Sequence, residues 1–323
     1  MNHGRSEPSV KRSSLLKLEN GDESVSIPLL TIEGQAAGPR LLVFAAVHGD
    51  EYEGVETILR LYERLSPEEL AGTLVMLPIA NPYAYRAGVR ISPDDDKNLA
   101  RVFPGKPDGT VTERLAYELH GLIAGSDFLL DLHSGGTHYS VATLAGYYHD
   151  PGSAFGRRCR AAAEAFGSPL LWGHESIAPG RSVSSAQALG VPWLYTEAYG
   201  GRRIRPEDSA LFYSGALRLM NHLGMLARSN PAELGEAPAE IRTIHGDGNF
   251  DESVVAAADG FFVPDVPLLA ELRAGERIGT IRSYGGEVLD EVRASSDGVL
   301  VMLLGTPIVR SGDSIYLIAP IRD

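Results

Sequence analysis

The sequence predicts an α/β fold with a mixed, largely parallel sheet flanked by helices, followed by a small all-β domain. In the first 235 residues, apolar runs of strand length alternate with amphipathic segments of helical period, which is typical of α/β proteins. The runs at residues 41–47, 73–80 and 128–132 are almost entirely apolar, as expected for strands buried on both faces. From about Ile241, short strand-like segments recur between turn signals such as Asp297-Gly298. We therefore expect two domains, residues 1–235 and 240–323, joined by a proline-containing linker.

The elements of the first domain follow from their periodicity and from the residues that end them. Residues 1–20 are expected to form a peripheral arm, and Gly38-Pro39 separates a strand at 24–31 from the strand at 41–47. Asn81-Pro82 ends the strand at 73–80, because proline cannot donate a hydrogen bond within a sheet. A long loop is then expected from Tyr83 to Thr110, and loops of this length in compact domains are usually functional. The other predicted elements are helices at 54–65, 112–124, 153–166 and 208–226, and a strand at 191–195.

Composition and charge exclude several classes of function. The formal charge of −13 argues against a nucleic-acid or anionic-membrane partner, because such binding needs clustered Lys and Arg. The single cysteine, Cys159, rules out an intrachain disulfide and a multi-cysteine metal site. Residues 1–14 are polar and lack the apolar segment of a secretory signal, so a cytoplasmic location is expected. The sequence does not define the oligomeric state, and a homo-oligomer remains one alternative.

Polar residues follow three of the predicted buried strands. His48 and Glu51 come directly after the strand at 41–47, His133 follows the strand at 128–132, and Glu197 follows the strand at 191–195. An H-x-x-E quartet alone is weak evidence, because it also fits a helix-capping turn with solvated charges. The carboxyl ends of parallel strands meet at one edge of a sheet, however, and this is where α/β proteins bind ligands. Two histidines and a glutamate gathered there suit a catalytic zinc site.

Longer motifs extend this pattern along most of the chain. The segments VHGDEYEG, NPYAYRAGVR, KNLARVFPG, DLHSGG and GVPWLYTEAYGG occur in this order, before the all-β tail. In this combination the chain resembles the succinylglutamate desuccinylase and aspartoacylase family of the zinc carboxypeptidase superfamily. Within that family it is similar to the bacterial branch of N-acetyl-diaminobutyrate deacetylase-like proteins. The resemblance implies a zinc carboxypeptidase-like fold.

The resemblance also implies the roles of the site residues. It makes His48, Glu51 and His133 the ligands of one Zn²⁺ per chain, with water in the fourth position, which is the arrangement of a catalytic rather than a structural zinc. Glu197 matches the family's general base, and Arg90 matches the arginine that faces the developing oxyanion. Each residue has a structural alternative. Glu197 could pair with a neighbouring arginine (Arg202 or Arg203), Arg90 could be a solvated loop charge, and His133 could be a neutral core imidazole.

The predicted substrate site departs from the family pattern at one position. Arg101 and Asn98 are expected to bind substrate, but the usual Asn-Leu-Asn-Arg reads Asn98-Leu99-Ala100-Arg101 here. Because the family's Asn-Arg pair holds a substrate carboxylate, Ala100 leaves the acid-bearing part of the substrate undefined. Asp131 is expected on the opposite face of its strand from His133, as at most an outer partner of the metal site.

The predicted function is that of a zinc-dependent amidohydrolase that removes a small acyl group from an N-acylated amino acid or related amine. The alternatives are a carboxypeptidase-like hydrolase of short peptides and a non-catalytic metal-binding regulatory module. The tail resembles biotinyl and lipoyl barrel-sandwich domains, but no lysine follows Lys106, so we expect a lid or packing module rather than a carrier. Structural roles are expected for the remaining polar candidates, which are His138, His149, His174, His245 and the acidic turn Asp94 to Asp96.

Overall fold

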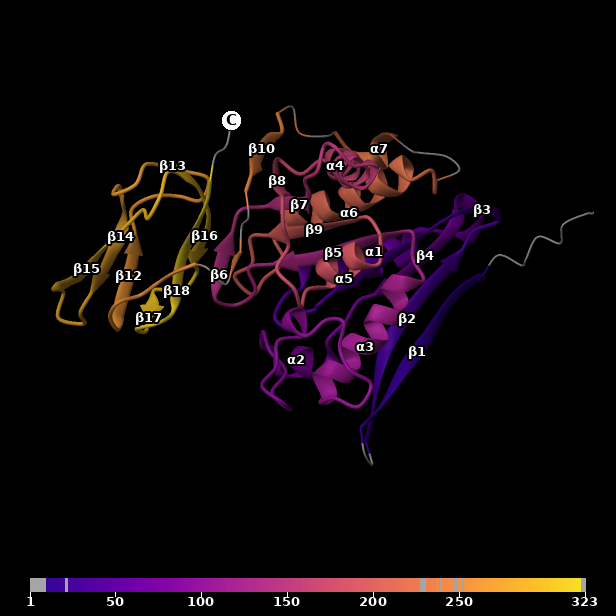
Figure 1. The fold of residues 1–323 in the computed structure, drawn as a ribbon, viewed down its shortest axis with the longest axis horizontal. Helices are drawn as coiled ribbons and strands as arrows, with labels where there is room; N and C mark the ends of the chain where they lie inside the picture. Colours follow the sequence, from indigo (N-terminus) through magenta and orange to yellow (C-terminus); the bar gives the residue numbers. More distant parts are fainter. Residues whose placement is uncertain are drawn as a thin grey trace, which may run out of the picture.

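The structure is a computed structural model that describes residues 10–20, 23–226, 231–236, 238, 240–246, 249–250 and 253–320. Its core is a nine-stranded sheet in the order β1-β2-β4-β3-β5-β9-β7-β8-β10 (Figure 1). The central strands β4, β3, β5 and β9 pair in parallel, whereas β7 runs antiparallel to β9. The predicted mixed, largely parallel sheet is therefore confirmed. The strands are β1 (Val10–Asn20), β2 (Glu23–Glu33), β3 (Ala36–Ala45), β4 (Ala71–Leu77), β5 (Phe128–Ser134), β7 (Leu144–Tyr148), β8 (Leu170–His174), β9 (Trp193–Ala198) and β10 (Arg242–His245).

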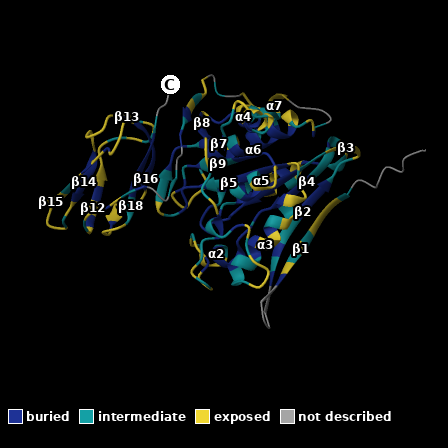
Figure 2. Cartoon of the chain, viewed as in Figure 1, coloured by how far each residue is buried: buried dark blue, intermediate teal, exposed yellow. Residues whose placement is uncertain are grey.

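Helices cover both faces of this sheet. Alternate residues of β3 enter two different hydrophobic clusters: Leu41 and Val43 pack with α1, α4 and α6, and Leu42 and Phe44 pack with α3 and α5. Figure 2 shows the central strands as buried, which explains why their sequence is apolar without alternation. The helices are α1 (Glu53–Arg64), α2 (Pro82–Ala87), α3 (Val111–Ala124), α4 (Ala154–Phe166), α5 (Ser182–Ala188), α6 (Pro206–His222) and α7 (Pro231–Leu234), with short 3₁₀ turns at Pro67–Glu69 and Leu99–Arg101. Within the described residues, no helix is long and apolar enough to cross a membrane.

Three segments differ from the sequence-based expectations. Part of the predicted peripheral arm forms β1, which pairs with β2 along its whole length. The predicted loop from Tyr83 to Thr110 contains α2, whose first turn is capped because the Asn81 side chain accepts a hydrogen bond from the Ala84 N–H. Asp95 is not merely solvated, because its carboxylate accepts hydrogen bonds from the backbone N–H and the hydroxyl of Thr112 at the start of α3.

The C-terminal residues form two antiparallel sheets at the opposite end of the molecule from β1 and β2 (Figure 1). One sheet has the order β11-β18-β16-β13 and the other β15-β14-β12-β17. Their strands are β11 (Val254–Val255), β12 (Gly260–Pro264), β13 (Glu271–Leu272), β14 (Arg277–Arg282), β15 (Val288–Arg293), β16 (Gly298–Leu304), β17 (Ile308–Val309) and β18 (Ser314–Ala319). Strand β10 joins the large sheet beside β8, although we expected the all-β domain to begin at residue 240.

The two parts of the chain share a sheet and a hydrophobic cluster. Strand β6 (Tyr139–Val141) leaves the α/β part and pairs antiparallel with β16. Around this pairing, Trp172 and Leu144 of the α/β part pack in one buried cluster with Val301 and Leu317 of the tail. Exposing this apolar surface to water would cost much free energy. The tail is therefore packed against the α/β part.

Candidate metal centre and active site

The turn after β3 places the first two candidate ligands. Strand β3 ends at Ala45, and Ala46 has φ 49°, a left-handed conformation that is rare for alanine. The turn is held because Asn81 N–H donates to the Ala46 carbonyl at 3.0 Å. His48 and Glu51 follow in the loop that leads into α1, at the carboxyl end of β3. Unusual backbone conformations of this kind concentrate at functional sites.

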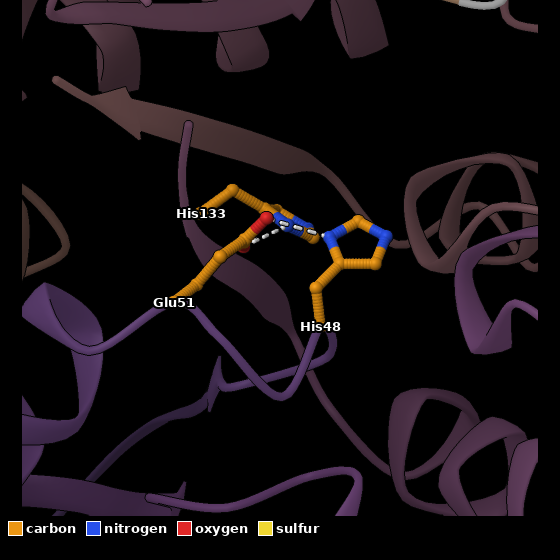
Figure 3. A group of neighbouring side chains, drawn as sticks. All are labelled: His48, Glu51 and His133. Atoms are coloured by element: carbon orange, nitrogen blue, oxygen red, sulfur yellow. Dashed lines mark hydrogen bonds and ion pairs between the residues drawn. The ribbon is translucent and has the colours of Figure 1, made fainter. Parts of the chain in front are cut away.

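The structure brings His48, Glu51 and His133 together, as predicted (Figure 3). The Nδ1 atom of His48 lies 2.7 Å from Glu51 Oε1, and the Nδ1 atom of His133 lies 2.9 Å from Glu51 Oε2. One donor atom from each residue lies within 4.8 Å of the others, so the three could hold a metal ion. His48 and Glu51 are only 3% and 2% exposed, which keeps the centre largely shielded from solvent.

The Nε2 atom of each imidazole, which points away from Glu51, contacts a side-chain oxygen. His48 Nε2 lies 3.2 Å from Asn98 Oδ1, and His133 Nε2 lies 3.1 Å from Asp131 Oδ2. These oxygens favour the tautomer that carries its hydrogen on Nε2, which leaves each Nδ1 lone pair directed at the shared centre. Two imidazole nitrogens and one carboxylate, with one position left for substrate, form a donor set that fits a catalytic zinc.

The charges of the three side chains depend strongly on one another. Burial raises the pKa of Glu51, but the two histidines outweigh this and hold it below its ordinary value. Burial lowers the pKa of His48 to about 4, and the nearby Arg90 adds to the effect. Burial also acts to lower the pKa of His133, but Asp131 and Glu51 outweigh it and raise that pKa well above 6.5. Glu51 is therefore anionic and His48 neutral near neutral pH, as metal ligands must be. The raised pKa of His133 favours its protonated form in the metal-free protein, and a bound metal ion would displace that proton.

Glu197 and Arg90 lie beside this centre. Glu197 pairs in register with His133 across β5 and β9, so its side chain emerges next to that ligand. Burial raises the pKa of Glu197 from 4.5 to about 8, partly offset by the charge of His133. Arg90 Nη1 donates to Glu51 Oε1 at 3.2 Å. Among the residues that the structure describes, Glu197 forms no ion pair with Arg202 or Arg203, so the structural alternative for this glutamate is not observed.

His48, His133, Arg90 and Glu197 line one pocket. Ala100 and Arg101 are in its wall, whereas Asn98 is not. The Asn98 Oδ1 atom lies 3.2 Å from His48 Nε2 and accepts a hydrogen bond from the Ala100 N–H at 2.9 Å. Asn98 thus contacts the candidate ligand His48, and its role in binding substrate stays a prediction. The full lining is His48, Arg90, Ala100, Arg101, Asp131, His133, His174, Ile177, Arg181, Ser182, Val183, Tyr195, Glu197 and Phe250.

A second hollow adjoins the first. It shares Arg90, Glu197 and Phe250 with the first pocket, and Met302 and Ser314 of the C-terminal sheets form part of its wall. The tail therefore lies beside the candidate active site.

Several pocket residues were missed or misplaced by sequence reasoning. Asp131 faces the same side as His133, because side chains two residues apart in a strand share a face; the expected opposite orientation was wrong. His174, expected to be structural, lies in the pocket wall with its Nε2 2.8 Å from the Tyr195 hydroxyl. Arg181 and Ser182 belong to no motif that the sequence singled out, and only the position of α5 brings them to the pocket.

Comparison with known proteins agrees with this geometry. The model of the succinylglutamate desuccinylase/aspartoacylase catalytic domain matches residues 37–223. The chain belongs to this family. The matched desuccinylase/aspartoacylase segment runs from β3 to α6 and includes every candidate ligand, Arg90 and Glu197.

Relatives match nearly the whole desuccinylase/aspartoacylase-type chain. The N-alpha-acetyl-L-2,4-diaminobutyric acid deacetylase of Halomonas elongata is 32% identical over 310 residues, 94% of this chain and 89% of that protein. A succinylglutamate desuccinylase structure from Silicibacter sp. TM1040 superimposes with a TM-score of 0.85 at 28% identity, covering 98% of this chain and 96% of that one. The product-bound ectoine utilization protein EutE (DoeB) of Ruegeria pomeroyi gives 0.84 at 30% identity, covering 97% and 95%.

Proposed function

We propose that this chain is a zinc-dependent deacylase that hydrolyses the amide bond of a small N-acylated amino acid or related amine. The observation that carries the proposal is one pocket lined by His48 and His133, two of the three candidate ligands, together with the Glu197 carboxylate of raised pKa and the Arg90 guanidinium. The third candidate ligand, Glu51, contacts both histidines directly behind this wall. The deacetylase activity of the Halomonas relative and the desuccinylase family of the chain support the same reaction class.

Glu197 is the proposed proton carrier. A bound zinc ion would polarise the substrate carbonyl and lower the pKa of the attacking water. The Glu197 carboxylate accepts the proton of that water and passes it to the departing amine, which are the two transfers that amide cleavage needs. A group that must both take and give a proton works best with a pKa near the working pH. The pKa of about 8 produced by burial suits this role, although a cation among the ligands would lower it.

Arg90 is the proposed oxyanion partner. Its guanidinium lies in the wall of both hollows and beside Glu51, so a positive charge stands next to the metal centre. A cation in this position stabilises the negative charge that develops on the carbonyl oxygen in the transition state more than it stabilises the neutral substrate.

Two guanidinium groups in the pocket wall favour an anionic substrate. Arg101, predicted from the sequence to bind substrate, lies in this wall, and Arg181 provides a second guanidinium there. Ala100, only 6% exposed, occupies a small volume beside Arg101 where the family usually has an asparagine. We therefore propose an N-acyl amino acid whose carboxylate relies on arginines rather than on an asparagine amide at this position.

The test is a substrate panel with zinc-loaded protein of known metal content. The panel contains N-acetyl-diaminobutyrate, other N-acetyl and N-succinyl amino acids, and unmodified dipeptides, with release of free amine as the readout. Turnover of an N-acyl amino acid with about one zinc per chain is expected. Cleavage of dipeptides alone would replace the proposal with a peptidase, and full zinc occupancy without any turnover would indicate a regulatory module.

A further inference from the structure

A buried chain of side-chain contacts runs from α5 to the candidate metal centre. The Ser182 hydroxyl, at the first residue of α5, donates to Asp131 Oδ2. The same oxygen lies 3.1 Å from His133 Nε2, and the other ring nitrogen of His133 faces Glu51. Ser182 is 4% and Asp131 1% exposed, so water cannot readily replace either contact.

We infer that Ser182 is a positioning residue for the metal ligand His133, acting through Asp131. The inference rests on the proposed zinc function and concerns a residue 51 positions away from Asp131 in the sequence. Two donors, the serine hydroxyl and the imidazole N–H, converge on one carboxylate oxygen. Together they hold the carboxylate plane, and the carboxylate in turn holds the imidazole plane, so that Nδ1 stays directed at the metal.

The other histidine ligand is supported in the same way. His48 Nε2 meets Asn98 Oδ1, and that oxygen is held by the backbone N–H of Ala100 at 2.9 Å. The Nε2 atom of each imidazole thus contacts a side-chain oxygen, and each of these oxygens also accepts a hydrogen bond from a further donor. For His48 that donor is a backbone group, whereas for His133 it is a side chain that mutation can remove.

The second oxygen of Asp131 shows why the serine matters. Asp131 Oδ1 is buried and has no hydrogen-bond partner among the described residues. Without the Ser182 hydroxyl, nothing described would distinguish the two oxygens except the imidazole itself. The carboxylate could then rotate, and His133 would lose its fixed orientation.

The chain offers a matched control on the same helix. Ser185 is also buried in α5, at 5% exposure, and its hydroxyl also contacts a histidine, His120, at 2.6 Å. His120 belongs to α3 and is remote from the ligands in the sequence and in its contacts. Loss of the Ser185 hydroxyl therefore reproduces the loss of folding stability caused by deleting a buried serine hydrogen bond, and it leaves the candidate metal centre unchanged.

The experiment measures zinc affinity by equilibrium competition with a chelator, and the thermal stability of the metal-free protein, for wild type, Ser182→Ala, Ser182→Thr and Ser185→Ala. Ser182→Ala should raise the zinc dissociation constant by about tenfold or more, the effect typical of an outer partner of a metal ligand. Ser182→Thr, which keeps the hydroxyl, should stay within about threefold of wild type, and Ser185→Ala should leave zinc affinity unchanged even where it lowers stability.

Equal zinc affinities in wild type and Ser182→Ala, with deacylase activity intact in both, would overturn the inference alone. A wild type that holds zinc but cleaves no N-acyl substrate would refute the proposed function and leave the inference standing. If Ser182→Ala does not fold, Asp131→Asn carries the test, because the amide keeps the shape and weakens the hold on His133. Unchanged zinc affinity in that variant would equally overturn the inference.

Discussion

Replacing Glu197 by glutamine removes the proposed proton carrier while preserving the shape of the side chain. We expect kcat to fall by about two to four orders of magnitude, which corresponds to roughly 3–5 kcal/mol of transition-state stabilisation. Zinc content should stay at the wild-type level, because the three donor atoms come from other residues. The assay follows amine release at saturating substrate, with metal content measured on the same sample. A variant with wild-type kcat and wild-type zinc would refute the role of Glu197 as base.

The same variant has a measurable effect on stability in the metal-free protein. Because burial raises the Glu197 pKa from 4.5 to about 8, the folded state holds a proton there more tightly than the unfolded chain does. The stabilisation from this proton is fully present below about pH 4.5 and is lost as the pH rises through 8. Glutamine binds no such proton, so the variant should not show this loss.

The size of the effect follows from the shift. A carboxyl pKa that moves from 4.5 to about 8 corresponds to at most about 5 kcal/mol. Since the side chain is only partly buried, solvent screening reduces this, and we expect about 1–2 kcal/mol. Urea unfolding in the presence of a chelator at pH 5 and pH 8 gives the comparison. Between pH 5 and pH 8, the free energy of unfolding of the wild type should fall by this amount more than that of Glu197→Gln. Parallel pH profiles would show that the carboxyl ionises normally.

Further variants test the remaining parts of the site. His133→Ala should lose zinc by elemental analysis, whereas the exposed His138→Ala should retain it; full occupancy in His133→Ala would remove that ligand from the set. Arg90→Ala should lower kcat more than it raises KM, because the charge that Arg90 faces develops during the reaction; a pure KM effect would make it a substrate-binding residue. Ala100→Asn should raise kcat/KM for simple N-acetyl α-amino acids by roughly tenfold relative to the native substrate, and an unchanged ratio would contradict a substrate contact there. Truncation before Ile241 should give insoluble protein, since it uncovers Trp172 and Leu144; a soluble, active truncation would show that the shared cluster is dispensable.

The fold class and the three metal-ligand candidates were accessible to sequence analysis because their signals are local. Strands buried on both faces need apolar side chains at every position, so β3 and β5 are visible as continuous runs. Parallel pairing of these strands brings their carboxyl ends to one edge of the sheet. His48 and His133 could therefore be placed close together from the sequence. Strand β1 was missed because its side chains, on an edge strand, are largely exposed.

The contacts that hold these candidate ligands, and the residues that surround them, follow only from the tertiary fold. Asn98 reaches His48 across 50 residues of sequence, and Ser182 reaches Asp131 across 51. The tail's β16 pairs with β6, which lies more than 150 residues earlier in the chain. Such contacts depend on helix placement and strand order, which arise from long-range packing and leave no periodic trace in the residues themselves. Local sequence patterns thus predict the sheet and the candidate metal ligands, whereas the packing of α5, β6 and the C-terminal strands sets the shape of the pocket and the contacts that hold those ligands.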